Sequence, residues 1–478
     1  MTPVLPLLAL LLTATASTAL PQPSKRWARP VVDLGYARYQ GVYNETTGIQ
    51  TFKGMRYAAP PVGDLRWRAP QDPENVSGLQ DASTYGDQCL QGTVGAGAGA
   101  PVAGVLSAAT GTFPTTSEDC LFINVFVPPN ATIGSGSLPV GVYIHGGGYS
   151  LGSGDDSDPT PLFAQANGNY IWVTINYRLG HFGFLAGKEV AEGGALNAGL
   201  LDQQAALQWV QKNIAKFGGD PGHVTIWGES AGAGSIYQQI VANGGNTQPK
   251  LFNGAIMASP FEPPNYYYNA SVPQAAYNHL ISAANCTSAA DTLECLRKTD
   301  AKLLTVAAYL DTFEGPKGDW LYTPVIDGTF IQDRPEALLA QGKVNGDRVW
   351  ITHNYNEGLV GGGAPGDVQS TFTPQDIGNS TTAQRSWLSS ILPNLDNASL
   401  TAVQDAYTAE TFGSLQTATD LIYGEGIFGC EALWISQAFT GRSYLGWLVI
   451  PGLDYHASDL TLSFGGKSSE FSRAPSRC

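Results

Sequence analysis

The sequence predicts an α/β fold with a large, mostly parallel central sheet and helices on both faces. Residues 138–145 (LPVGVYIH) and 170–177 (YIWVTINY) are short, nearly continuous apolar runs, typical of strands buried on both faces. Residues 199–217 follow with apolar side chains at helical spacing. Another strand-like run (223–227) and another helical one (235–242) come next. Alternation of this kind indicates a parallel sheet with helices on both sides.

The composition fits one large domain and argues against some partners. The 478 residues are 43% hydrophobic and 10% aromatic, enough for a sizeable core. Glycine and proline are spread evenly along the chain, so we expect residues 20–478 to form a single domain without a linker. The 40 acidic residues outnumber the 25 basic ones, which gives a net charge of −15. Because phosphate binding needs clusters of Lys and Arg, this charge argues against nucleic acid as a partner.

The N-terminus indicates secretion. Residues 1–19 are typical of a signal peptide, with an apolar run followed by small residues that end at Ala19. That run is too short to cross a bilayer as a helix, and no later stretch is long enough. We therefore expect a secreted, extracellular protein with no integral membrane segment after signal removal. Seven Asn-x-Ser/Thr sequons fit this location and are candidate glycosylation sites: Asn44, Asn75, Asn130, Asn269, Asn285, Asn379 and Asn397.

Cysteines and glycines give two further expectations. None of the six cysteines belongs to a Cys-x-x-Cys pair or accompanies a histidine cluster. The sequence therefore predicts disulfides, no metal site and no cofactor. Residues 92–111 are rich in Gly and Ala and carry no charge. They lack the preceding strand and the Lys of a phosphate-binding loop, so we expect a mobile surface loop there.

Two Gly-x-Ser-x-Gly segments offer a nucleophilic serine, residues 148–152 (GYSLG) and 228–232 (GESAG). Ser150 follows a glycine run and precedes GSGDDSDP, which cannot begin a helix at once. Ser230 directly follows the strand-like HVTIW and precedes the helical SIYQQIVA, which places it on a sharp strand-to-helix turn. Its flanking glycines let strand and helix approach closely. We predict Ser230 as the nucleophile; an ordinary helix N-cap is its alternative role.

A glycine run supplies the donors that a tetrahedral intermediate needs. His145 is followed by three glycines at the end of a predicted strand, where backbone N–H groups can point at one oxygen. The helix after Ser230 adds its first N–H group and the positive end of its dipole. Gly147, Gly148 and Ala231 are therefore the candidate oxyanion-hole donors.

A nucleophilic serine also needs a base and an acid that orients the base. In this strand–turn–helix context both follow the serine in the chain, which leaves His279, His353 and His456 as bases. His279 lies in a helical pattern and His353 close to Glu357, whereas His456 follows a Pro-Gly loop (PGLDYH). We predict His456 as the base. Glu357, in a turn after the strand-like RVWITHN, is the first choice for the acid, and Asp454 is the alternative.

These motifs, in this order, resemble the type-B carboxylesterase/lipase family, which includes cholinesterases, fungal lipases and neuroligins. The similar segments are FKGMRYAAPPVGDLRWRAP (52–70), SEDCLFINV (117–125), HGGGY (145–149), NYRLGHFGFL (176–185), LLDQQAALQWVQKNIAKFGGDP (200–221), VTIWGESAG (224–232), NEG (356–358) and HASDLTLSFG (456–465). PGLDYHASDL looks closest to fungal secreted members. The resemblance implies the α/β-hydrolase fold and a triad of Ser230, Glu357 and His456, which favours Glu357 over Asp454.

The resemblance also implies two disulfides. Cys89 with Cys120 would close a loop that forms a lid or rim over the site, and Cys286 with Cys295 would close a short loop. The first loop contains no Trp, whereas cholinesterases hold a quaternary ammonium there by cation–π attraction. A choline ester is therefore not expected as substrate. The remaining Cys430 and Cys478 have no assigned pairing.

The leading hypothesis is a secreted serine carboxylesterase or lipase that cleaves a small-molecule or lipid ester through an acyl-enzyme. Family members continue for several helices beyond the catalytic histidine, whereas this chain ends soon after His456 in an atypical polar tail, residues 466–478. We therefore expect a truncated C-terminal end. The rival hypotheses are a catalytically inactive binding or adhesion member of the same fold and an inactive truncated product.

Overall fold

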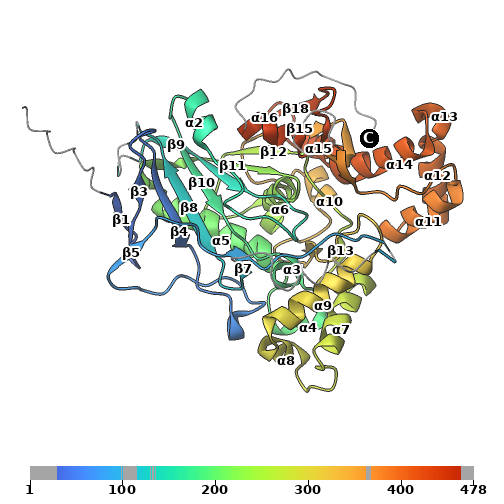
Figure 1. Ribbon diagram of the computed structural model, residues 1–478, viewed down its shortest axis with the longest axis horizontal. Coiled ribbons are helices and arrows are strands. Elements are labelled where there is room, and N and C mark those ends of the chain that lie inside the picture. Colours follow the sequence, from blue (N-terminus) through green and yellow to red (C-terminus); the bar gives the residue numbers. More distant parts are fainter. Residues whose placement is uncertain are drawn as a thin grey trace, which may run out of the picture.

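The computed structural model describes residues 29–97, 99–100, 116–129, 131, 134, 136–361 and 368–464. Within these ranges the main sheet has nine strands in the order β18-β15-β12-β11-β9-β10-β8-β4-β3 (Figure 1). The neighbours from β18 to β10 pair in parallel, and those from β10 to β3 pair antiparallel. The predicted large, mostly parallel sheet is confirmed. Its strands are β3 (Val42–Tyr43), β4 (Gln50–Arg56), β8 (Phe122–Val127), β9 (Leu138–Ile144), β10 (Ile171–Ile175), β11 (Gly219–Glu229), β12 (Gly254–Ala258), β15 (Arg348–Asn354) and β18 (Ser443–Leu448).

The apolar runs of the sequence are the central strands. Strands β9 and β10 lie side by side, and all five residues of β10 are buried, as expected for a strand covered on both faces. The predicted helix over 199–217 is α5 (Ala198–Asn213) continued by one 3₁₀ turn (Ile214–Phe217). The helix after the second Gly-x-Ser-x-Gly segment is α6 (Ala231–Gly245).

Helices cover both faces of the sheet. Helices α5, α6, α10 (Pro335–Ala340) and α15 (Cys430–Ala438) pack on one face with the larger apolar core. The other face carries α2 (Thr160–Gln165) and α16 (Ser458–Phe464), which contact each other. There the ring of Phe464 stacks 5.8 Å from that of Trp227 and lies 5.4 Å from that of Tyr143. This smaller cluster of aromatic side chains closes the second face.

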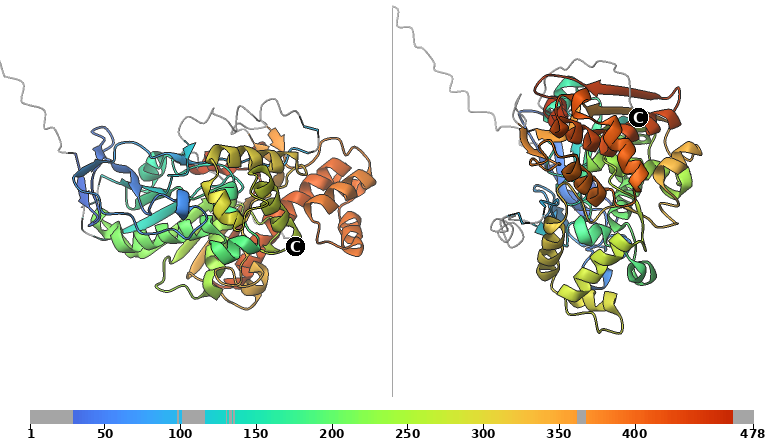
Figure 2. Two further views of the ribbon diagram at one scale, coloured as in Figure 1. Left: turned by 90° about the horizontal axis from the view of Figure 1, so that it is seen from below. Right: turned by 90° about the vertical axis from the view of Figure 1, so that its right-hand side faces the viewer.

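The remaining elements lie around the edges of the main sheet (Figure 2). The other helices form two groups. The first lies at the bottom of Figure 1 and consists of α3 (Gly180–Phe184), α4 (Lys188–Gly193), α7 (Ser271–Ala283), α8 (Thr292–Lys298) and α9 (Ala301–Glu314). The second lies at the right of that figure and consists of α11 (Thr381–Ile391), α12 (Asn397–Ala406), α13 (Ala409–Phe412) and α14 (Leu415–Gly424). A π-helical turn (Glu425–Gly429) joins α14 to α15. Small sheets are formed by β1 (Val31–Asp33), β2 (Arg38–Gln40) and β5 (Leu79–Asp81), by β6 (Gln88–Cys89) and β7 (Thr116–Ser117), and by β13 (Tyr266–Tyr267) and β14 (Val325–Ile326). Among the described helices, none is long and apolar enough to span a membrane.

The carboxyl edge of the parallel strands is where the candidate residues meet. β11 ends at Glu229, one residue before Ser230, and β15 ends just before β16 (Asn356–Gly361), which contains Glu357. The loop after β18 leads to β19 (Tyr455–His456). Strands β16 and β19 pair with each other and form a small sheet with β17 (Val368–Thr371). This edge is the usual place for a site in an open α/β sheet.

Candidate active site

Ser230 lies between the end of β11 and the start of α6, as the sequence predicts. Its backbone has φ 54° and ψ −127°, a conformation that costs energy for a residue with a Cβ. Close packing enforces this turn, because a Cβ on Gly232 would lie 2.0 Å from the carbonyl oxygen of Ile144. The Ser230 side chain makes no capping hydrogen bond to α6. Ser230 therefore occupies the N-cap position of α6 without the side-chain hydrogen bond of an ordinary N-cap.

A hydrogen-bonded chain joins the three predicted triad residues. The Ser230 Oγ lies 2.9 Å from Nε2 of His456, and Nδ1 of His456 lies 2.6 Å from Oε2 of Glu357. All three residues are buried. Pairing of β16 with β19 brings Glu357 and His456 together across about a hundred residues of sequence. The other carboxylate oxygen of Glu357 accepts hydrogen bonds from the Ser259 hydroxyl at 2.6 Å and from the N–H of Asn354.

One local expectation about Glu357 is wrong. The sequence places it in a turn, but it is the second residue of strand β16. The turn between β15 and β16 is confined to Tyr355. Since β16 pairs with both β17 and β19, the strand fixes the direction of the carboxylate more firmly than a turn would.

The alternative acid and bases have other partners. Asp454 accepts a hydrogen bond from Nδ2 of Asn356 at 2.8 Å. His279 lies on α7 and pairs with Asp311 at 2.6 Å. The ring of His353 packs 5.0 Å from that of Trp447. Within the described part of the chain, no hydrogen bond joins any of these three residues to Ser230.

The glycine run lies beside Ser230. A Cβ on Gly146 would be only 3.0 Å from the Cβ of Ser230, so the two backbones are in close contact. Gly147 and Gly148 have φ values of 98° and 60°, which favour glycine, and neither N–H group donates a hydrogen bond to a described residue. Ala231 opens α6, where a first-turn N–H has no partner within the helix. The three predicted oxyanion donors therefore belong to two segments that meet at the serine.

Carboxyl groups surround the imidazole. Besides Glu357, Glu229 places Oε1 3.5 Å from Nε2 of His456. Burial lowers the pKa of His456, but the charges of Glu229 and Glu357 raise it more, to about 9. Burial raises the pKa of Glu229 to about 8 and that of Asp459 to about 6. Burial also raises the pKa of Glu357, but hydrogen bonds from His456 and Ser259 lower it more, so it falls below its usual value and the group stays ionised.

Sequence reasoning missed several residues of this site. Glu229 and Asp459 lie inside the recognised motifs, so their acidic character next to the nucleophile and the base was a usable signal. A group of aromatic side chains that forms one wall of the site had no such signal in the sequence. The ring of Phe428 lies 4.5 Å from that of His456, and the ring of Trp320 lies directly on Gly148, where a Cβ would be 2.1 Å from Cζ3. Phe261 and Phe372 complete this wall, with ring centroids 5.8 and 6.4 Å from Trp320.

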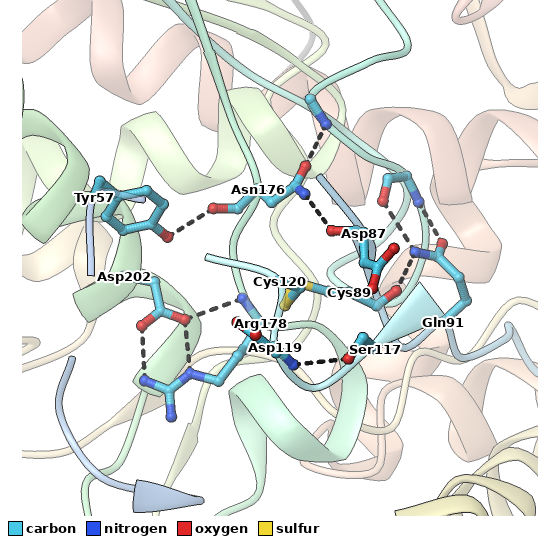
Figure 3. The surroundings of a disulfide bond; sticks show 12 residues. Tyr57, Asp87, Cys89, Gln91, Ser117, Asp119, Cys120, Asn176, Arg178 and Asp202 are labelled. Carbon is cyan, nitrogen blue, oxygen red and sulfur yellow. Dashed lines mark hydrogen bonds and ion pairs between the residues drawn. A yellow bond between two sulfur atoms is a disulfide. The ribbon is translucent and has the colours of Figure 1, made fainter. Parts of the chain in front are cut away.

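Both disulfides implied by the resemblance are present. Cys89 is bonded to Cys120, and Cys286 to Cys295. Around the first bond, Asn176 donates to the backbone oxygen of Asp87 at 3.1 Å, and Gln91 donates to the backbone oxygen of Cys89 at 2.8 Å (Figure 3). Cys430 is disulfide-bonded as well, whereas Cys478 and the tail 466–478 lie outside the described residues.

Other predicted features are distributed over the surface or lie outside the described residues. Six sequon asparagines are exposed: Asn44, Asn75, Asn269, Asn285, Asn379 and Asn397. Asn130 and the signal segment 1–19 are outside the described residues. In the ranges that the structure describes, no three His, Cys, Asp or Glu side chains are grouped as a metal site would require.

Comparison with known proteins agrees with this geometry. Residues 28–445 match the model of the carboxylesterase family. A carboxylesterase of Aspergillus clavatus is 36% identical over 397 residues, which are 75% of this chain and 70% of that protein. A secreted triacylglycerol lipase of Gibberella zeae is 38% identical over 308 residues, 62% of this chain and 52% of the lipase. The crystal structure of EstA of Aspergillus niger superposes with a TM-score of 0.78 at 33% identity, covering 92% of this chain and 84% of that one. The predicted α/β-hydrolase fold is confirmed by such solved esterases.

Proposed function

Since this chain belongs to the carboxylesterase family, we propose that it hydrolyses carboxylic esters through a covalent acyl-enzyme on Ser230. Family membership makes the chain a carboxylic ester hydrolase, and the proposal concerns its residues and steps. The observation that supports it most is the hydrogen-bonded chain from Ser230 through His456 to Glu357, with distances of 2.9 and 2.6 Å. A weak nucleophile beside an oriented base is the arrangement that acyl transfer needs.

The first half-reaction forms the acyl-enzyme. Ser230 Oγ attacks the ester carbonyl carbon while Nε2 of His456 takes the hydroxyl proton. The tetrahedral intermediate then collapses, the bond to the alcohol oxygen breaks, and His456 returns the proton to that oxygen. Glu357 stays ionised throughout, holding Nδ1–H of His456 in place and stabilising the imidazolium.

The second half-reaction uses the same groups with water. His456 removes a proton from a water molecule, which attacks the acyl carbon, and the acid product leaves as Ser230 regains its proton. In both steps the N–H groups of Gly147, Gly148 and Ala231 stabilise the oxyanion. Their preorganisation matters because donors that need no rearrangement in the transition state contribute most.

We infer that the substrate is a neutral ester. The walls beside His456 and Gly148 are aromatic, with Trp320, Phe372 and Phe428 as the nearest rings. Apolar acyl groups gain about 0.8 kcal/mol for each buried CH₂. The loop closed by Cys89 and Cys120 lacks the Trp that would favour a choline ester. Turnover of butyrylcholine as efficient as that of a neutral butyrate ester would contradict this inference.

We also propose that the protein is secreted and glycosylated. Disulfides persist in oxidising compartments, and this chain has Cys89 paired with Cys120 and Cys286 with Cys295. The exposed sequon asparagines would be accessible to glycan attachment. Treatment of the secreted protein with an endoglycosidase should increase its electrophoretic mobility. Unchanged electrophoretic mobility would contradict glycosylation, and retention of the protein inside the cell would contradict secretion.

The catalytic proposal is tested with p-nitrophenyl esters of rising acyl length. The wild-type chain should release p-nitrophenolate, with an initial burst that matches the enzyme concentration for any ester whose acyl-enzyme is hydrolysed more slowly than it forms. Ser230→Ala should remove the burst and the steady-state rate while the melting temperature stays the same. A full rate in this variant would contradict the proposal.

A further inference from the structure

A short connection after α9 carries an aromatic side chain to residues 146–152, the turn that holds the candidate donors Gly147 and Gly148 and is called the oxyanion turn below. Residues 315–320, called the strap below, follow α9 and end at Trp320. The Trp320 ring lies so close to Gly148 that a Cβ there would be 2.1 Å from Cζ3 and 2.4 Å from Cη2. The position of the strap therefore decides how near this ring lies to a candidate oxyanion donor.

A second segment is hydrogen-bonded to the strap. Residues 89–97, called the limb below, begin at the first disulfide. Gly95 donates to the carbonyl of Asp319 at 2.8 Å and accepts from the N–H of Gly318 at 3.0 Å. Gly97 donates to the carbonyl of Gly315 at 3.0 Å. The sequence predicts a mobile loop over residues 92–111, of which 98 and 101–111 lie outside the described residues. In its first part, Gly92, Gly95, Ala96 and Gly97 donate backbone hydrogen bonds to other segments.

The other end of the limb is bonded to the oxyanion turn. Gly92 donates to the carbonyl of Ser150 at 2.6 Å. The side chain of Gln91 accepts from the N–H of Gly152 at 2.7 Å and donates to its carbonyl at 3.1 Å (Figure 3). The limb thus connects the oxyanion turn to the strap. The strap also contacts this turn directly, through Trp320 and Gly148.

Gly95 is a point of close approach between limb and strap. A Cβ there would lie 2.0 Å from the carbonyl oxygen of Pro316, which is backbone and cannot rotate away. The φ of Gly95 is not in the left-handed region. The contact with Pro316, and not the local backbone conformation, therefore excludes a side chain at Gly95.

The far side of the strap is also anchored. The hydroxyl of Tyr423 donates to the carbonyl of Gly318 at 2.9 Å, and Nε1 of Trp387 donates to that of Lys317 at 2.9 Å. The strap is therefore hydrogen-bonded on both sides. A displacement by the limb would move the Trp320 ring, which packs on Phe372 beside His456.

We propose that the limb is a latch that fixes Trp320 over Gly148, and that Gly95 is a positioning residue that sets the size of acyl group accepted there. The inference rests on the proposed ester hydrolysis and extends it to substrate selection. With the strap latched, Trp320 occupies space beside the oxyanion turn and favours short acyl groups. Pushing the strap away from Gly95 would open that space to longer ones.

The test is a double-mutant cycle on acyl selectivity. We compare kcat/KM for p-nitrophenyl acetate with that for p-nitrophenyl hexanoate in wild type, Gly95→Ala, Trp320→Ala and the double variant. Gly95→Ala should lower the acetate-to-hexanoate ratio by about tenfold, the scale on which small changes in an apolar pocket discriminate substrates. In the Trp320→Ala background Gly95→Ala should change the ratio no further, because the ring through which it acts is gone.

Gly222→Ala is the matched control, since the atoms nearest to a Cβ there belong to the half-buried side chain of Asp220, and its ratio should equal that of wild type. If Gly95→Ala does not fold, as its melting curve would show, the cycle is run with Gln91→Ala, which removes the bonds to Gly152 without adding volume. An unchanged ratio, or the same shift with and without Trp320, would overturn the latch. If the wild-type chain hydrolysed neither ester, the proposed function itself would be contradicted. The wild-type rates therefore test that function separately from the latch.

Discussion

The chain contains Gly-x-Ser-x-Gly twice, and the two segments have different structures. In residues 228–232 the serine lies between β11 and α6, with its hydroxyl 2.9 Å from His456. In residues 148–152 the serine lies in a turn closed by hydrogen bonds from its own N–H and that of Leu151 to Gly147. Both serines are buried, 7% and 2% exposed, so burial does not distinguish them. The secondary-structure elements before and after each serine distinguish the two.

The residue before each serine shows the same contrast. Glu229 precedes Ser230 and faces the imidazole, 3.5 Å from Nε2 of His456. Tyr149 precedes Ser150 and packs in the core, with its ring 5.1 Å from that of Phe184. In the proposed mechanism, the first segment supplies the nucleophile, and the second belongs to the turn that holds the proposed oxyanion donors Gly147 and Gly148. The two matches serve one site in different ways.

The largest expected effect separates the two serines. Ser230→Ala should lower kcat by several orders of magnitude, because the triad acts as a unit, and His456→Ala should cost about as much. The double variant should be little slower than either one. Ser150→Ala keeps the backbone bonds of its turn and should retain most activity. Initial rates with p-nitrophenyl acetate check this; inactivation by Ser150→Ala with full activity in Ser230→Ala would reverse the assignment.

The next effect concerns the acid that orients the base. Glu357→Gln keeps the shape of the side chain but removes the charge next to Nδ1 of His456. It should lower kcat by about 10⁴-fold, the scale of the loss when a triad carboxylate becomes an amide. Asp454→Asn is the control, because Asp454 is bonded to Asn356 and should change kcat little. Equal losses in the two variants would show that Glu357 has no special role.

A smaller effect concerns the disulfide next to the first segment. Replacing Cys89 and Cys120 with Ser opens a loop with a sequence separation of 31 and should lower the free energy of unfolding by about 3–4 kcal/mol. Cys286 and Cys295 close a separation of 9, so their removal should cost about 2.5 kcal/mol.

Urea unfolding of both variants measures these costs. Only the first pair adjoins the limb, so only its loss should also change acyl selectivity. A change in acyl selectivity after loss of Cys286 and Cys295 would contradict a special role of the Cys89–Cys120 bond in selectivity.

The smallest expected effect is a shift in pH dependence. Catalysis needs neutral His456, so kcat/KM should rise with pH through its pKa, which is about 9. Glu229→Gln removes a group that raises this pKa, so the rise should move to lower pH. Tyr149→Phe, the matched change before the other serine, should leave the profile in place. A shift of the Glu229→Gln profile to higher pH would contradict the charge assignment around His456.

Local patterns predicted the scaffold well and the site in part. Strands such as β9 and β10 follow from continuous apolar runs, and Ser230 follows from its place between a strand and a helix. Local sequence made Glu357 the first choice over Asp454, and the resemblance strengthened that choice, because no local pattern reports which carboxylate points at His456.

Contacts between distant segments were not predictable. Trp320 lies on Gly148, and Ser259 supports Glu357, through packing between elements that the sequence does not order in space. The bonds of the limb to the strap involve backbone groups of Gly95 and Gly318, which carry no side-chain signal. A stretch of Gly and Ala therefore predicted a mobile loop from residue 92 where the structure has a hydrogen-bonded contact.

Covalent labelling tests the central claim most directly. The purified wild-type chain is incubated with a fluorophosphonate probe, digested, and its peptides are analysed by mass spectrometry. A serine activated by His456 attacks the phosphorus, so the account predicts one adduct, on the peptide that contains Ser230, and its loss in His456→Ala. An adduct on Ser150, or no adduct on a folded chain that still hydrolyses esters, would contradict Ser230 as the nucleophile.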